Sequence, residues 1–169
     1  MVSWSYRGLG GSQKIEVIKR IKLMEHNSIL LIQETKKTVV DNLSSMKKLW
    51  PKGEGFAISV SGASGGFLTW WDNEKFSLQT VTENKNWLFV KLKNKENKEA
   101  FWVKNIYGPM TQAHKEIFWN SLEEQCEGKK QTLCFVAGNF NVTIFADERR
   151  GGVKVRDPFG ERLEDLATH

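Results

Sequence analysis

The stretch GFAISVSGASGGFLTWWDNEKFSLQTVTENKNWLFVKLKNKENKEAFWVKNIY, residues 55–107, alternates β-forming runs with turns. Runs such as GFLTWW and NWLFVKLK are rich in aromatic and β-branched residues, which are common in strands. The segments SGASG, DNEK, TENK and NKENK lie between the runs, and their glycine, asparagine and aspartate are typical of tight turns. The simplest interpretation of this stretch is an antiparallel meander.

Helical patterns and buried strands lie on both sides of this stretch. Ser12 is placed to cap a helix, and residues 39–50 form a second apolar helical pattern that Pro51 ends. The runs SILLIQE and TLCFVAG are apolar throughout, as in strands buried on both faces. We therefore expect an α/β (α+β) chain of two packed sheets with helices outside. The expected apolar helix faces are Ile15, Ile18, Ile21 and Met24; Val40, Leu43, Met46 and Trp50; and Ile117, Phe118, Leu122 and Cys126.

The composition is that of a globular chain about the size of one domain, since 40% of its 169 residues are hydrophobic. Lysine and arginine outnumber aspartate and glutamate by 25 to 20, so the net charge of +5 favours polyanions as partners. The cysteines, Cys126 and Cys134, lack the spacing of a metal or redox site. Apolar runs such as ILLI are too short to span a bilayer, so we expect no membrane partner and an intracellular location.

Polar residues follow apolar strands at Gln33–Glu34, at Asn105 with Tyr107, and at Asn139 with Asn141. Strand ends that meet at one rim of a sheet often gather a ligand, so these groups are candidates for a site. Each group also has a structural interpretation. Glu34 could be a solvated strand end, and Tyr107 could pack under a turn. The two asparagines could serve turn geometry alone, because asparagine tolerates left-handed backbone and bonds to its own main chain.

Taken in order, WSYRGLGG, LLIQETK, SGGFLTWW, VKNIYGP, VAGNFN and DERRGG resemble the endonuclease/exonuclease/phosphatase family. More narrowly, they resemble the apurinic-type endonuclease domain of plant non-LTR (LINE-type) retrotransposons. The resemblance covers residues 1–169 as a single domain. It implies a four-layer α/β/β/α sandwich of two mostly antiparallel sheets that cuts a DNA phosphodiester with Mg²⁺ or Mn²⁺. The wider family includes phosphatases of lipids and nucleotides, but SGGFLTWW and DERRGG favour the retrotransposon branch.

The resemblance also implies roles for individual residues. Glu34 is the metal carboxylate, and Ser5 stands near the metal where the family usually has asparagine. Tyr107 and Asn141 contact or orient the scissile phosphate, while Asn139 occupies the place of an aspartate that orients the attacking water. The arginines expected to meet the DNA backbone are Arg7, Arg149 and Arg150. A nuclear location is implied, a small-molecule cofactor is not, and the oligomeric state stays open.

Three departures from the family pattern predict weak or absent catalysis. Ser5 is shorter than asparagine, and the amide of Asn139 cannot accept a proton. If the family aspartate handles a proton, its loss should lower the rate on the order of a hundredfold to ten-thousandfold. The family's C-terminal Asp-His pair has no counterpart before His169, so we expect a domain that lacks its C-terminal part. The alternative is a non-catalytic retrotransposon-derived relic with at most weak nucleic-acid binding through phosphates.

Overall fold

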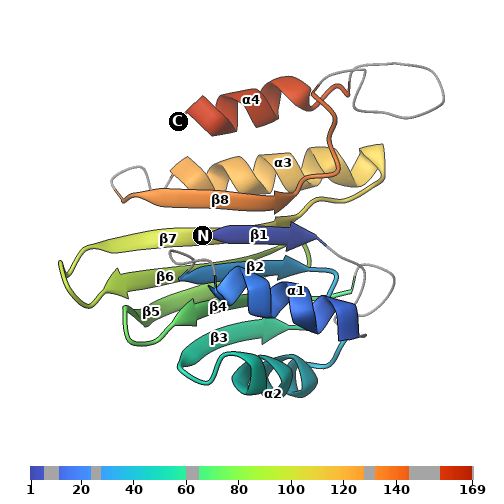
Figure 1. The fold of residues 1–169 in the computed structure, drawn as a ribbon. Helices are drawn as coiled ribbons and strands as arrows, with labels where there is room; N and C mark the ends of the chain where they lie inside the picture. The colour runs from blue at the N-terminus through green and yellow to red at the C-terminus, as the bar shows by residue number, and fades with distance from the viewer. Residues whose placement is uncertain (6–11, 24–27, 60–64, 128–131, 145–156, 169) are drawn as a thin grey trace. The chain divides into compact units, whose positions relative to one another are not determined.

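The structure, a computed structural model, describes the chain except for residues 6–11, 24–27, 60–64, 128–131, 145–156 and 169 (Figure 1). The chain divides into two compact units. The first unit is Met1–Ile106 with Gln131–Gly138, and the second is Tyr107–Lys130 with Asn139–His169. The elements are β1 (Val2–Ser5), α1 (Ser12–Leu23), β2 (Ile29–Gln33), α2 (Val39–Leu49), β3 (Gly53–Ile58), β4 (Phe67–Asp72), β5 (Phe76–Glu83), β6 (Trp87–Asn94), β7 (Ala100–Tyr107), α3 (Gln112–Glu127), β8 (Cys134–Asn139) and α4 (Gly160–Thr168).

The strands form two mixed sheets of four, in the orders β1-β2-β4-β3 and β5-β6-β7-β8. In the first sheet β1 runs parallel to β2, and the β2–β4 and β4–β3 pairs are antiparallel. In the second sheet β5, β6 and β7 form an antiparallel meander. The Trp102 N–H donates to Leu133 O and the Gly108 N–H to Asn139 O, with the same offset along both strands, so β8 runs parallel to β7. The predicted α/β class with two mostly antiparallel sheets and flanking helices is confirmed.

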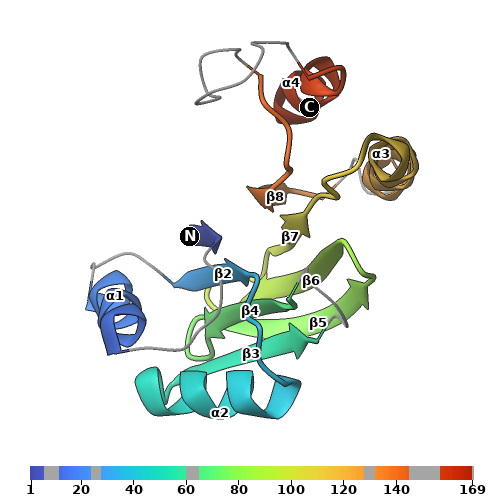
Figure 2. The ribbon, with the colours of Figure 1, turned by 90° about the vertical axis from the view of Figure 1, so that its right-hand side faces the viewer.

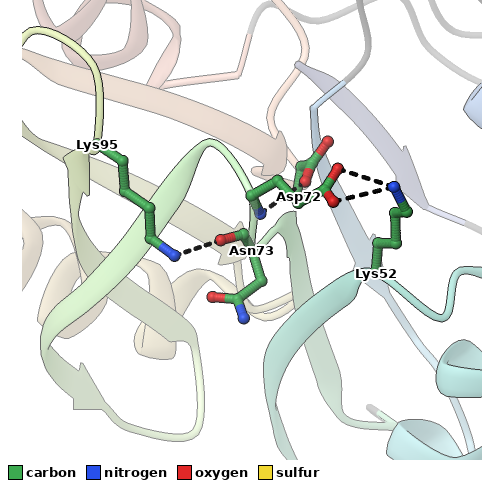
Figure 3. A network of polar contacts seen from close by, with 5 residues as sticks. Lys52, Asp72, Asn73 and Lys95 are labelled. Carbon is green, nitrogen blue, oxygen red and sulfur yellow. Dashed lines mark hydrogen bonds and ion pairs between the residues drawn. The ribbon is translucent and has the colours of Figure 1, made fainter.

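The prediction of one continuous meander is wrong between β4 and β5, which belong to different sheets. The physical reason is that β2 and β3 already pair with both edges of β4, so β5 has no free edge to join. Figure 3 shows how the connecting turn is held. Asp72 Oδ1 accepts the N–H of Glu74, Lys52 Nζ donates to the Glu74 carboxylate, and Lys95 Nζ donates to Asn73 O.

Helices α1 and α2 cover one face of the first sheet (Figure 2). The α2 helix begins after Thr38, whose Oγ1 accepts the Asp41 N–H at 3.1 Å, as an N-cap does. This start places Val39 against the core and leaves Val40 74% exposed, so the prediction that Val40 faces the core is wrong. The buried residues between the helices and the sheet are Ile18, Leu30, Ile32, Met46, Trp50, Ala57, Leu68 and Trp70.

In the second unit, α3 and α4 are joined by polar contacts. Arg162 reaches from α4 to the carboxylate of Glu123 and to Asn120 Oδ1, and its guanidinium lies 5.9 Å from the centre of the Trp119 ring. The α3 helix buries Phe118, Trp119 and Leu122, whereas Ile117, predicted to lie on the apolar face, is 68% exposed. Within the described ranges, no helix is both long enough and apolar enough to cross a membrane.

Candidate functional site

The first unit brings two predicted metal-site residues to the same edge of a sheet. Because β1 and β2 are parallel, their carboxyl ends lie together, and Ser5 pairs in register with Gln33, the residue before Glu34. Ser5 is exposed, whereas Glu34 is only 8% exposed. Glu34 is therefore not a solvated strand end, and this alternative from the sequence is wrong. A largely buried carboxylate at a strand end is unusual enough to need a structural or chemical reason.

The chain after β2 forms a tight turn with backbone in the left-handed region, at φ 56° for Glu34 and φ 50° for Lys36. Hydrogen bonds to Gly65 and Gly66 fix this turn. The Lys36 N–H donates to Gly65 O at 2.7 Å, and the Thr35 N–H donates to Gly66 O at 3.3 Å. Non-glycine residues in this conformation cost energy, and such strain often accompanies functional sites.

The two glycines before β4, Gly65 and Gly66 of the segment SGG, are required by the local backbone and by close contacts. Their φ angles are 57° and 74°, and a Cβ on Gly66 would lie 2.7 Å from Ile58 O and 2.9 Å from Thr35 Oγ1. Asn42, which is fully buried on α2, donates from Nδ2 to the same Thr35 hydroxyl at 3.0 Å. The paired glycines therefore let the Glu34 turn pack closely against the start of β4. From the sequence alone this segment was only part of a family resemblance.

Gln33 and Asn105 do not lie on the rim that the sequence suggested. Both side chains are fully buried between the two sheets of the first unit. Gln33 Nε2 donates to Asn105 Oδ1 at 2.6 Å and to Ser3 Oγ at 3.1 Å. The strand-end pattern identified both residues as polar groups in apolar strands, but it gave them a ligand-facing position instead of an inter-sheet one.

The second unit joins the YGP and GNFN corners to each other. The Gly108 N–H donates to Asn139 O at 2.7 Å, and Asn141 Nδ2 donates to Gly108 O. A Cβ on Gly108 would lie 2.2 Å from Phe140 O, so only glycine allows this approach. Tyr107, immediately before this glycine, is 4% exposed, as expected for a tyrosine that packs under a turn.

Asn139 and Asn141 both hold the shape of the corner. Asn139 Oδ1 accepts the N–H of Asn141 at 2.9 Å, and Asn141 has a left-handed φ of 52°. This arrangement is the turn chemistry that the sequence left open as an alternative. An aspartate at position 139 could accept the same hydrogen bond. The asparagine therefore preserves the geometry of the corner without supplying a negative charge.

The donor set for a divalent metal is small in the described part of the chain. No three side chains of His, Cys, Asp or Glu come together in the described residues. Glu34 is the one carboxylate among the predicted site residues. Mg²⁺ usually keeps several waters and is held by one or two carboxylates together with substrate phosphates. The described residues fit a weakly held, largely hydrated ion of this kind, and they do not fit a tightly bound one.

The remaining candidates fall outside this geometry. Arg7, Arg149 and Arg150, predicted to contact DNA, lie outside the described residues. His114 Nδ1 lies 2.8 Å from Thr111 Oγ1 at the start of α3, so this histidine contributes to the geometry of the helix end. The structure thus places Ser5 and Glu34 in the first unit and Tyr107, Asn139 and Asn141 in the second.

Comparison with known proteins identifies similar folds. No family model matches the sequence, and no curated protein is similar to it in sequence. An endonuclease/exonuclease/phosphatase family protein from Bacteroides thetaiotaomicron matches 83% of this chain over 62% of its own length, with a TM-score of 0.67 and 16% identity. A mannosyl-6-phosphatase from the same species matches 83% of this chain over 64% of its own length, with a TM-score of 0.64 and 16% identity.

A functionally unknown conserved protein from Enterococcus faecalis matches 98% of this chain over 72% of its own length, with a TM-score of 0.66 and 14% identity. The chain spans less than two thirds of the length of the two Bacteroides proteins. At these identities the similarity shows a shared fold. That fold is the sandwich fold of endonuclease/exonuclease/phosphatase proteins.

Proposed function

We propose that this chain is a divergent endonuclease/exonuclease/phosphatase domain of LINE-type retrotransposon origin. We further propose that its ancestor cut DNA phosphodiesters with Mg²⁺ or Mn²⁺, and that hydrolysis is weak or absent in the present chain. The shared fold and the order of the sequence motifs support the ancestry. The net charge of +5 supports DNA as the partner, since phosphate contacts dominate the affinity of such interactions. A nuclear location belongs to the same proposal.

In this proposal Glu34 holds the divalent ion with Ser5 beside it. When bound, such an ion polarises a phosphoryl oxygen and neutralises charge on the leaving oxygen. The burial of Glu34 supports a role beyond solubility, and its rigid turn would fix the direction of the carboxylate. Tyr107 and Asn141 are proposed to contact the scissile phosphate, and Arg7, Arg149 and Arg150 to meet the DNA backbone.

The state of Asn139 is the observation that carries the proposed loss of activity. Its Oδ1 is engaged with the Asn141 N–H, and its amide has no basic atom that could take a proton from water. A positioned general base typically contributes a factor of about 10² to 10⁴ to the rate. Ser5, with its shorter side chain, weakens the metal side of the site as well.

A supercoiled-plasmid nicking assay with Mg²⁺ or Mn²⁺ tests this proposal. The wild-type chain is compared with Glu34→Ala and with Glu54→Ala, which removes an exposed carboxylate from β3 as the matched control. We expect no nicking that depends on Glu34. Robust nicking that Glu34→Ala abolishes and Glu54→Ala preserves would show an active site and contradict the proposed loss. A phosphomonoester substrate in parallel tests the activity named for the mannosyl-6-phosphatase.

A further inference from the structure

A pair of buried amides crosses the inter-sheet core of the first unit. Asn105 lies on β7, and its Nδ2 donates to Leu68 O at 3.0 Å, to Thr69 Oγ1 at 3.3 Å and to Ile32 O at 3.4 Å. Its Oδ1 accepts from Gln33 Nε2 at 2.6 Å. Asn105 therefore contacts both β2 and β4 of the opposite sheet through directional hydrogen bonds.

An apolar side chain at position 105 would avoid the free-energy cost of burying an amide. Leu31, Leu88 and Val103 are all fully buried in the same unit. Burying amides is unfavourable unless each polar atom is paired, and Gln33 Oε1 is buried with no hydrogen-bond partner among the described residues. The amide pair differs from a leucine pair in being directional, because a hydrogen bond depends on both the distance and the angle between its partners.

The two backbone carbonyls that accept from Asn105 belong to one residue pair of the β2–β4 ladder near the Glu34 turn. Ile32 and Leu68 are paired in the β2–β4 register, and the neighbouring pair, Gln33 and Phe67, lies between them and the turn. The two chain segments that continue from this pair are the ones joined by the bonds from Thr35 and Lys36 to the paired glycines. Asn105 thus bonds to the two strands, β2 and β4, whose ends continue into the turn.

We infer that Asn105 is a positioning residue that acts through Gln33 and the backbone of β2 and β4 to fix the Glu34 turn. The inference rests on the proposed role of Glu34 as the metal carboxylate. Its consequence for the backbone can nevertheless be measured without any activity, so failure of the proposed function and failure of this inference give different results.

The test is amide hydrogen exchange on the full chain carrying Gln33→Leu and Asn105→Leu together. The double variant replaces both partners of the Gln33–Asn105 hydrogen bond by apolar groups, while the acceptors Leu68 O, Ile32 O and Ser3 Oγ lose a donor, so we expect a moderate loss of stability in a chain that still folds. We expect the Lys36 amide, bonded to Gly65, to exchange at least about tenfold faster. The Asp72 amide, which donates to Ser28 O at the other end of β4, should keep its rate. Thr69→Val, which removes only the 3.3 Å contact, is the matched control.

An unchanged Lys36 exchange rate in a stable double variant would overturn the inference, because the amide pair would then serve packing alone. Should the double variant not fold, Asn105→Asp provides the second test. It keeps the acceptor for Gln33 but replaces the donor toward Leu68 and Ile32 by an oxygen. Faster Lys36 exchange with an unchanged Asp72 rate supports the inference, and an unchanged Lys36 rate overturns it. Absence of nicking by the wild type bears only on the proposed function.

Discussion

Asn139 Oδ1 accepts the Asn141 N–H at 2.9 Å, and this contact helps to hold the corner at a position where the resembled family has aspartate. Sequence reasoning could predict the tight turn, because asparagine and glycine favour it. The burial of Glu34 could not be predicted in the same way. It depends on Gly65 and Gly66, which lie beside the turn in space but follow it at a distance along the chain.

Substitutions at Asn139 can separate the effect of its hydrogen bond on the stability of the corner from the effect of adding a negative charge. Asn139→Asp keeps an acceptor for the Asn141 N–H, so we expect its unfolding temperature to match the wild type. Asn139→Leu removes the acceptor and should cost about 1 kcal/mol, or roughly 2–4 °C in Tm for a chain of this size. Thermal unfolding by circular dichroism measures both. Equal losses from the two variants would show that the hydrogen bond does not hold the corner.

The paired glycines should differ in their tolerance of alanine. A Cβ on Gly66 meets the backbone oxygen of Ile58 at 2.7 Å, whereas a Cβ on Gly65 meets the flexible Lys36 side chain at 2.9 Å. We therefore expect Gly66→Ala to lower the free energy of unfolding by about 1–3 kcal/mol, and Gly65→Ala by less. Denaturant titration gives the ranking. The reverse order would contradict the described packing of the turn.

At the level of elements, local sequence patterns predicted the strands and helices, but they did not predict which strands pair with each other. Apolar periodicity predicted α2. Which of its residues face the core depends on where the helix begins, and the cap at Thr38 places Val39 inside and Val40 outside. Residues 55–107 indicated strands correctly. The pairing of β4 with both β2 and β3, which sends β5 to the other sheet, is a long-range contact that local composition does not encode.

The second unit contains a buried ion pair that should contribute strongly to its stability. Lys115 Nζ and Asp157 Oδ2 lie 2.6 Å apart, and both side chains are almost completely buried. Lys115→Met removes the cation that lies 2.6 Å from the buried Asp157 carboxylate, so we expect a loss of about 3–5 kcal/mol. Urea unfolding measures this loss. A loss close to zero would contradict the expected contribution of this pair.

The matched control is Lys52→Met, which removes an exposed ion pair. The hydrogen bond to Glu74, followed by the attraction of its charge, raises the pKa of Lys52 above the ordinary value of 10.5. The pair therefore contributes its full stabilisation below this value and loses it as the pH rises through the raised pKa. Because exposed pairs contribute little, Lys52→Met should leave the unfolding curve at neutral pH unchanged.

At the scale of the whole molecule, the sequence predicted two sheets with helices, and the structure and its similar folds agree. The candidate site could be predicted only as a set of strand ends. Whether a polar residue at such an end faces a ligand or the core depends on which sheet packs over it. For this reason Gln33 and Asn105 were assigned to the rim although they lie between the sheets.

The proposed DNA contact of the whole chain predicts a salt dependence. Weak binding through phosphates should lose affinity linearly on a logarithmic salt scale, with a slope of about 0.9 per phosphate contacted. Replacing Arg149 and Arg150 together by alanine should lower that slope by about 1–2 if both meet the backbone. Fluorescence anisotropy with a short duplex measures it, and Lys95→Ala is the control. An unchanged slope would remove these arginines from the proposed interface.

The corner at Asn139 keeps its hydrogen-bonded geometry without the negative charge that the resembled family has at this position. The consequence for catalysis is measured by plasmid nicking with Mn²⁺, comparing the wild type and the variant Asn139→Asp, each beside its Glu34→Ala counterpart. We predict that both proteins are folded and that neither nicks robustly, because Ser5 still replaces the longer asparagine expected beside the metal. Robust nicking by either protein that disappears with Glu34→Ala would show that the site can cleave DNA and would refute the proposed loss of activity.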